Sequence, residues 1–237
     1  MTFEAGYSFA PDQALEDLDP FARGDQMKRL VVAPHADDET YGCGGLMAKY
    51  PDEMEVLVLA EASAIRWVEF TDALNLFSIT EKQQRCLNLP DGEVGANMPR
   101  LVELLDSTFA ALQPTEVYLP FPGLHQDHIA AYEAGMRACR RSMSPNHWFA
   151  PNVFVYDVPA YDLELQNWPL RWSQFEVLSE ADVTVKAHAV GCYKSELTQG
   201  APHPGSPDEV VMQARVIGSS CGVRYAEKYA PVRVIRG

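Results

Sequence analysis

The chain has 237 residues, 47% of them hydrophobic and 22% charged, which excludes wholesale disorder and predicts one α/β domain with extensions. The balance of 19 basic against 33 acidic residues gives a net charge of −14, so the chain lacks the cationic field that nucleic acids or anionic membranes attract. Five dispersed cysteines form no C-x-x-C pair. The sequence pattern predicts neither a secretory signal nor an apolar segment long enough to span a membrane. We expect a reduced, cytoplasmic protein.

The elements predicted in chain order alternate between strands and helices. The acidic, proline-broken residues 1–27 predict an extended arm ahead of a domain formed by residues 28–237. Helical periodicity predicts an amphipathic helix over 99–112, with Pro99 in its first turn. The apolar runs that predict buried strands are 30–33, 54–60, 117–119 and 153–156. This alternation predicts a single α/β domain with a Rossmann-like, mostly parallel sheet and helices on both faces.

Polar segments directly follow two of these predicted strands. Pro34–Glu39 (PHADDE) follows the first, and Gly123–His128 (GLHQDH) follows the run at 117–119. Ligands bind outside the carboxyl ends of the strands in such sheets, so both segments are expected to face one crevice. Together they supply three imidazoles and four carboxylates. Two such clusters at the expected ligand edge indicate a metal site.

The residue types suit a catalytic divalent ion. Zinc takes neutral imidazole nitrogens and a carboxylate oxygen, and a catalytic site leaves one position for water. His35 and Asp38, three residues apart, can reach one ion, and His128 can reach it from the neighbouring segment. A water bound there has its pKa lowered towards ~7, which makes hydroxide available at neutral pH.

Other interpretations of single residues stay open. Asp37 and Asp127 could each cap a helix, and Glu39 could stabilise a helix start. Glycines at 42, 44 and 45 could mark a dinucleotide turn, although the G-x-G-x-x-G pattern is incomplete. His203, in a loop rich in proline and glycine, could approach the site or remain on the surface.

The two motifs resemble those of a known family. PHADDE resembles the P-H-P/A-D-D-E signature of the LmbE-like, N-acetylglucosaminyl-phosphatidylinositol de-N-acetylase-like (PIG-L) family, and HQDH resembles its H-x-D-H motif. Both motifs in order make a specific signal. The resemblance continues through Gly42–Leu46, Arg66–Ala73, Leu89–Gly92 and Ala214–Tyr229, so it covers about 30–235.

The resemblance implies a zinc-dependent deacetylase that acts on an N-acetylated amino sugar or its conjugate. His35, Asp38 and His128 match the metal ligands, and Asp37 matches the general base. His125 matches the histidine that stabilises the oxyanion or protonates the leaving amine, and Asp127 matches the carboxylate that orients it. Ferrous iron or another divalent ion suits the same ligands. Hydrolysis of a different N-acyl small molecule, or a metal-bearing binding module without turnover, are the alternatives.

Two positions near the expected site need separate comment. Some relatives carry a tyrosine two residues before the first histidine of H-x-D-H, whereas this chain has Gly123. Arg66 opens the helix after the second predicted strand and is predicted to attract an anionic group of the substrate. The alternative is that Arg66 forms an ion pair with Glu69 or an aspartate and only stabilises the helix.

Overall fold

The computed structural model describes residues 27–142, 147–158, 170–197 and 205–235. The predicted arm lies outside the described residues, except for Met27. His203 lies outside them as well. The strands are β1 (Arg29–Ala33), β2 (Met54–Ala60), β3 (Gln84–Leu89), β4 (Glu116–Pro120), β5 (Asn152–Tyr156), β6 (Gln174–Val177) and β7 (Ala226–Arg233). The helices are α2 (Asp38–Lys49), α3 (Ala64–Leu76), α4 (Met98–Leu112), α5 (Gln126–Ala138), α6 (Glu180–Val190) and α7 (Pro207–Cys221), with short 3₁₀ turns η1 (Pro51–Glu53) and η2 (Glu81–Gln83). Within these ranges, no helix is long and apolar enough to cross a membrane.

The strands form one sheet in the order β3-β2-β1-β4-β5-β7-β6. Neighbours from β3 to β5 pair in parallel, and β7 pairs antiparallel with both β5 and β6. The predicted single α/β domain with a mostly parallel sheet is therefore confirmed, and the four predicted strands are β1, β2, β4 and β5. The sequence prediction did not include β3, β6 and β7.

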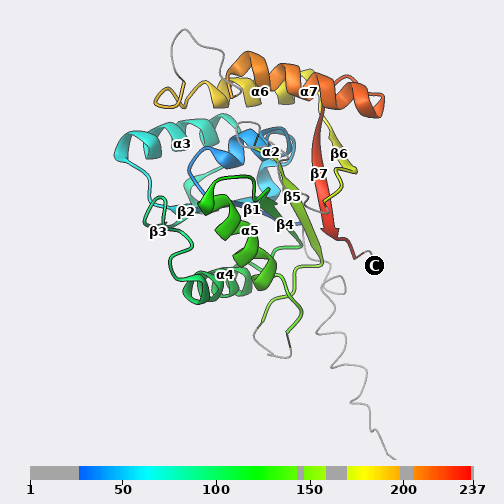
Figure 1. Ribbon diagram of the computed structural model, residues 1–237. Helices are drawn as coiled ribbons and strands as arrows, with labels where there is room; N and C mark the ends of the chain where they lie inside the picture. Colours follow the sequence, from blue (N-terminus) through cyan, green and yellow to red (C-terminus); the bar gives the residue numbers. More distant parts are fainter. Residues whose placement is uncertain (1–26, 143–146, 159–169, 198–204, 236–237) are drawn as a thin grey trace, which may run out of the picture.

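Each face of the sheet packs against its own layer of helices (Figure 1). Alternate residues of β1 point to opposite sides: Val31 joins the core beneath α2, α3 and α6, and Val32 joins the core beneath α4 and α5. This alternation follows from the period of two in a strand. The predicted amphipathic helix is α4, which buries Leu101, Leu105 and Phe109. Figure 1 also shows α6 and α7 lying side by side on the layer that contains α2.

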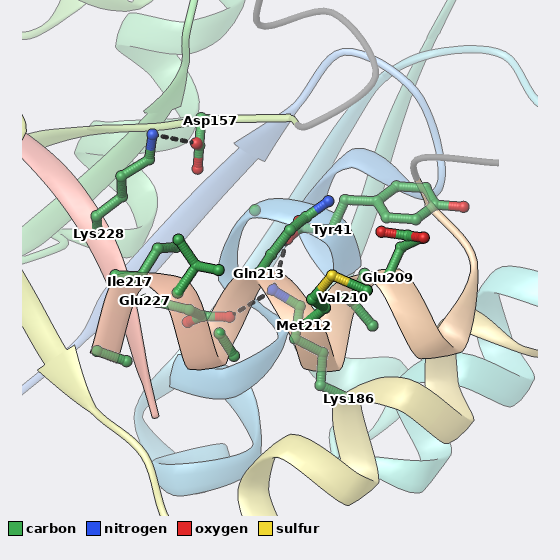
Figure 2. Close-up of a pocket in the computed structure, with 14 residues that line it drawn as sticks. Tyr41, Asp157, Lys186, Glu209, Val210, Met212, Gln213, Ile217, Glu227 and Lys228 are labelled. Atoms are coloured by element: carbon green, nitrogen blue, oxygen red, sulfur yellow. Dashed lines mark hydrogen bonds and ion pairs between the residues drawn. The ribbon is translucent and has the colours of Figure 1, made fainter. Parts of the chain in front are cut away.

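Helix α2 is held by a carboxylate buried beside its middle turn. The side chain of Glu227 on β7 accepts hydrogen bonds from the backbone N–H groups of Gly45 (2.6 Å) and Leu46 (2.9 Å), and from the hydroxyl of Tyr229 (2.7 Å). The ammonium of Lys186 on α6 completes the group at 2.7 Å (Figure 2). The cavity in Figure 2, about 360 Å³ in volume, borders this ion pair. The pair thus fixes α2, whose first turn carries predicted site residues.

The α2 glycines have a packing role. A Cβ atom on Gly42 would come within 2.0 Å of the Tyr156 ring, and one on Gly45 within 2.4 Å of Leu178. Both positions lie inside the helix, so they let α2 approach its neighbours closely and form no phosphate-binding turn. The dinucleotide interpretation is not supported.

Removing one partner of the buried pair should strongly destabilise the protein. Lys186→Met leaves the Glu227 carboxylate buried without its cation, which typically costs about 3–5 kcal/mol. The matched control is Arg224→Ala, which breaks the exposed pair with Glu180 and should cost about 0–1 kcal/mol. Urea denaturation of both variants measures the free energies of unfolding. Equal losses would contradict the anchoring role of the buried pair.

Candidate active site and metal centre

The candidate site lies at the point in the sheet where the strand order reverses, between β1 and β4. From β1 the order continues through β2 to β3 on one side, and β4 and β5 lie on the other. The carboxyl ends of β1 and β4 are adjacent, because these two strands pair in parallel. The segment after β1 leads into α2, and the segment after β4 leads into α5. Ligand crevices of open α/β sheets form at such switch points.

One carboxylate brings the three predicted metal ligands together. Oδ2 of Asp38 lies 3.2 Å from Nδ1 of His35 and 3.3 Å from Nε2 of His128. The same oxygen accepts a hydrogen bond from the backbone N–H of His35 at 2.9 Å, which closes the turn between the two residues. Asp38 and His128 are buried, and His35 is mostly buried.

The Asp38 carboxylate lies at a ligand-like distance from each of the two imidazoles. Two ligands of a tetrahedral zinc ion, at bond lengths of about 2.0–2.1 Å, lie roughly 3.3 to 3.4 Å apart. The separations from Asp38 to the two imidazoles are close to that value. Among the described residues, the groups whose ligand atoms all lie within 4.8 Å of one another are His35, His125 and His128, and His35, Asp91 and Asp127. His35 belongs to both groups, and His128 to the first.

Electrostatics favour Asp38 as a ligand of a cation. Burial opposes ionisation of Asp38, but the charges and hydrogen bonds of His128 and His35 outweigh it and hold the pKa of that carboxyl well below its usual range. A buried, ionised carboxylate in contact with both imidazoles supplies negative charge that a dication requires. Asp38 therefore remains, with His35 and His128, in the ligand set that we propose below.

Metal uptake should be coupled to the loss of a proton from His35. Burial lowers its pKa, but the hydrogen bond and charge of Asp38, with smaller contributions from Asp37 and Asp127, raise it overall to about 9. His35 is thus protonated in the metal-free protein at neutral pH, and it must lose that proton to bind an ion.

Zinc affinity should therefore rise by about tenfold per pH unit between pH 6.5 and 8.5, because one proton is displaced per ion. Competition with a fluorescent chelator measures this affinity. His125→Ala, which leaves the proposed ligands in place, is the control and should keep the same slope. An affinity independent of pH would contradict the assignment of His35 as a ligand.

The structure places the Asp127 carboxylate beside His35. Its Oδ2 lies 3.2 Å from Nε2 of His35 and accepts the backbone N–H of Gly92 at 2.8 Å, while Oδ1 accepts that of Val94 at 3.1 Å. The sequence had paired Asp127 with His125, but these contacts direct the buried carboxylate to His35 and to the turn after β3. Metal-ligating histidines commonly carry such a carboxylate on their second nitrogen, where it fixes the ring orientation.

Asp127→Asn should weaken zinc binding by about 10- to 100-fold, as loss of such supporting carboxylates typically does. Asp91→Asn is the matched control. Asp91 lies 3.3 Å from the same His35 nitrogen, but its side chain is 68% exposed, so its loss should change the affinity little. Chelator competition measures both variants. Unchanged zinc affinity in Asp127→Asn, with loss of activity alone, would return Asp127 to the role of orienting His125.

Asp37 occupies the N-cap position of α2, yet its side chain makes no capping hydrogen bond. Its Oδ2 instead accepts a hydrogen bond from Nη1 of Arg66 at 2.6 Å. Burial and the neighbouring Asp38 raise the pKa of Asp37 to about 7, against the lowering effect of Arg66. A carboxylate with this pKa can take up and release a proton near neutrality.

His125 is the half-buried N-cap residue of α5. Its Nδ1 accepts the backbone N–H of Asp127 at 3.2 Å, so the neutral ring carries its proton on Nε2. Burial, and then the positive charges of His35 and His128, lower its pKa. The resting imidazole is thus a neutral donor through Nε2, which suits stabilisation of an oxyanion.

Glu39 links two elements of the structure. It is buried and accepts hydrogen bonds from the hydroxyls of Thr40 (2.7 Å) and Tyr193 (2.8 Å), so it joins α2 to the turn after α6.

Two further positions near the site are Gly123 and Asp91. Gly123 has a positive φ of 49°, a backbone conformation in which a tyrosine would be strained. Sequence reasoning missed Asp91 as a site residue. Its signal was its place in Leu89–Gly92, the segment after β3 that was noted only as part of the family resemblance.

The fold and the site define a class of protein: a Rossmann-like α/β domain whose central strand ends gather imidazoles and carboxylates suited to a divalent ion. The family model described as "PIG-L: GlcNAc-PI de-N-acetylase" matches residues 30–139, which contain both motifs. This match, and the deacetylase relatives described below, confirm the similarity to the PIG-L (LmbE-like) family that the motifs predicted.

Two individual proteins are similar to most of this chain. The uncharacterized deacetylase YaiS of Escherichia coli (strain K12) is 24% identical over 181 residues, which cover 70% of this chain and 90% of YaiS. The conserved protein TT1542 from Thermus thermophilus superposes with a TM-score of 0.69, at 24% identity, covering 90% of this chain and 97% of that one.

Solved structures of different activities share the fold. GalB, the 4-carboxy-2-hydroxymuconate hydratase from Pseudomonas putida KT2440, superposes with a TM-score of 0.68 at 18% identity, covering 89% of this chain and 99% of GalB. Other matched structures are of deacetylases, including a zinc-inhibited form of the teicoplanin deacetylase Orf2. Because a hydratase and deacetylases share this fold, the reaction has to be argued from the side chains.

Proposed function

We propose that the protein is a metal-dependent N-deacetylase that hydrolyses the acetamide of an N-acetylated amino sugar or its conjugate. The observation that carries the proposal is the placement of Asp37 and His125 beside the cluster of His35, Asp38 and His128. The match of residues 30–139 to a family model described as GlcNAc-PI de-N-acetylase supports the acetamide and the amino sugar. Zinc is the expected ion, with ferrous iron or another divalent ion as the alternative.

His35, Asp38 and His128 would hold the ion, which supplies an activated water and polarises the acyl oxygen. Asp37 accepts a proton from the attacking water as its oxygen bonds to the acyl carbon. His125 donates a hydrogen bond from Nε2 to the developing oxyanion, as its tautomer allows. Asp37 then returns the proton to the amine nitrogen as the C–N bond breaks. The products are acetate and a free amine.

The proposal is tested by acetate release over a panel of N-acetylated sugars and their conjugates, with N-acetyl amino acids as non-sugar controls. The protein is loaded with one equivalent of zinc or ferrous iron, because excess zinc could inhibit as it does in the Orf2 structure. Acetate from sugar substrates alone is the expected result. Release from the non-sugar amides would favour a different amidase, and no turnover with a bound metal would favour a binding module.

Asp37→Asn should retain the metal and lose about 10²- to 10⁴-fold in rate, the usual contribution of a general base. Metal content by elemental analysis and steady-state kinetics measure the two effects separately. Glu39→Gln is the matched control for a neighbouring buried carboxylate, and its kcat should fall far less. If Asp37→Asn kept its rate and Glu39→Gln lost it, Glu39 would be the base.

A further inference from the structure

The cavity of about 360 Å³ lies between α7, the first turns of α2 and the start of β7 (Figure 2). Small-molecule sites usually have volumes of about 300–1,000 Å³, a range that includes this cavity. Tyr41 and Gly42 of α2 form one wall, shortly after the proposed metal ligand Asp38. The residues proposed to bind the metal, and the proposed base Asp37, do not line it. The cavity is therefore a separate site that begins about one helical turn from the metal cluster.

A second wall of the cavity is apolar. It comes from α7 and β7 and consists of Val210, Met212, Ala214, Val216, Ile217 and Ala226. Met212 is 54% exposed and Val216 is 64% exposed, although both border a concave surface. Because covering apolar side chains removes their surface from water, this wall favours a ligand with a hydrocarbon part.

The charged residues of the lining leave one negative charge without compensation. Lys186 pairs with Glu227 at 2.7 Å, and Lys228 pairs with Asp157 at 2.8 Å. Among the described residues of the lining, the remaining charged side chain is Glu209, in the first turn of α7. Its carboxylate makes no ion pair or hydrogen bond with the part of the chain that the structure describes. A positive group on a ligand would balance this charge, whereas a phosphate or a carboxylate would be repelled.

Tyr41 supplies a second unsatisfied group. Only 8% of this residue is exposed, yet its hydroxyl has no hydrogen-bond partner within the described ranges. Burial, and then the charge of Asp37, raise the pKa of Tyr41 well above its usual range, so the hydroxyl keeps its proton. A Cβ atom on Gly205 would lie 2.9 Å from this hydroxyl, and Figure 2 shows the ring and the Glu209 carboxylate at the same end of the cavity. A buried hydroxyl without a partner is costly, which favours a ligand that forms a hydrogen bond with it.

We propose that this cavity binds a small apolar molecule that carries a protonated amine. Glu209 and Tyr41 hold the ammonium group, and Met212 and Val216 pack against the hydrocarbon part. An ammonium carries only N–H donors, and the carboxylate and the phenol oxygen both accept hydrogen bonds. The face of a tyrosine ring also attracts a cation. The inference does not rest on the proposed function, because binding of such a molecule is measured without acetate release.

The class of ligand is tested with probes that share one hydrocarbon chain: hexylamine, hexan-1-ol and hexanoate. Isothermal titration calorimetry of the zinc-loaded protein at neutral pH, where hexylamine is protonated, measures the three affinities. We expect hexylamine to bind about tenfold more tightly than hexan-1-ol, because hydrogen bonds to charged groups are the stronger ones. Hexanoate should bind most weakly. Equal affinities for the three probes, or no binding of hexylamine, would overturn the proposal.

The variant Glu209→Gln separates the charge of the cavity from its shape. It should lower the affinity for hexylamine by about tenfold and leave the affinity for hexan-1-ol unchanged. Asp208→Asn is the matched control, because Asp208 lies in the same helical turn, is exposed and does not line the cavity. It should bind hexylamine as the wild type does. Equal losses in the two variants would mean that overall charge alone attracts the amine, against a site at Glu209.

Two further variants test the remaining contacts. Tyr41→Phe should weaken hexylamine binding by about threefold. Its Tm should not fall, because the hydroxyl that it removes bonds to no described residue. Met212→Ala should weaken binding of hexylamine and hexan-1-ol by the same factor, since both chains pack on the same wall. Wild-type affinities in both variants would contradict the proposed contacts.

Other locations and occupants give different results. Asp37→Asn should bind hexylamine as the wild type does, and a loss would place the ammonium among the carboxylates beside the metal and overturn the proposal. Light scattering tests whether a second copy of the chain covers Met212 and Val216. We expect Val216→Lys and the wild type to have the same mass. A wild-type dimer that Val216→Lys dissociates would assign this face to a protein interface and overturn the proposal.

Discussion

The parallel pairing of β1 with β4 at the centre of the sheet is the constraint on which the site depends. It sets the carboxyl ends of two strands side by side although 87 residues separate Arg29 from its register partner Glu116. The polar segments that leave these ends lead into α2 and α5, so both helices begin at the same edge of the sheet. The buried Glu227–Lys186 pair then prevents α2 from shifting, and the position of Asp38 relative to His128 follows from this support.

Charge balance explains why so many acidic groups can gather in one place. His35 lies within 3.3 Å of carboxylate oxygens of Asp38, Asp91 and Asp127, and Asp37 adds a fourth negative group close by. Without compensation these groups would repel one another or take up protons. Three positive charges can offset this excess of negative charge: that of protonated His35, whose pKa is raised, that of the Arg66 guanidinium, and that of a bound dication. The surrounding network thus prepares the site for a cation.

Local patterns in the sequence were enough to predict the alternating architecture and the meeting of the two motifs, because buried parallel strands are continuous apolar runs. Strand β3 was missed because QRCLNL alternates weakly and lies at the sheet edge, where its residues are half-buried or exposed. Strands β6 and β7 carry charges, and the sheet position of β7 depends on antiparallel pairing that no local pattern encodes.

The partners of individual side chains were harder to predict than the site itself. The contact of Asp127 with His35 spans 92 positions, and that of Ser195 with Arg66 spans 129. Such pairs are set by how loops cross the strand ends, whereas sequence spacing favours near neighbours such as His125. Asp127 therefore contacts a histidine that sequence spacing did not suggest, while the residues of the two motifs lie together as expected.

The metal site proposed for His35, Asp38 and His128 can be located by anomalous diffraction at the zinc edge, in crystals of the zinc-loaded protein. We expect a single ion bound by one imidazole nitrogen of each histidine and by the carboxylate of Asp38, at about 2.0–2.2 Å. An ion held by His125 in place of Asp38, or no ion at this edge of the sheet, would show that the proposed ligand set is wrong.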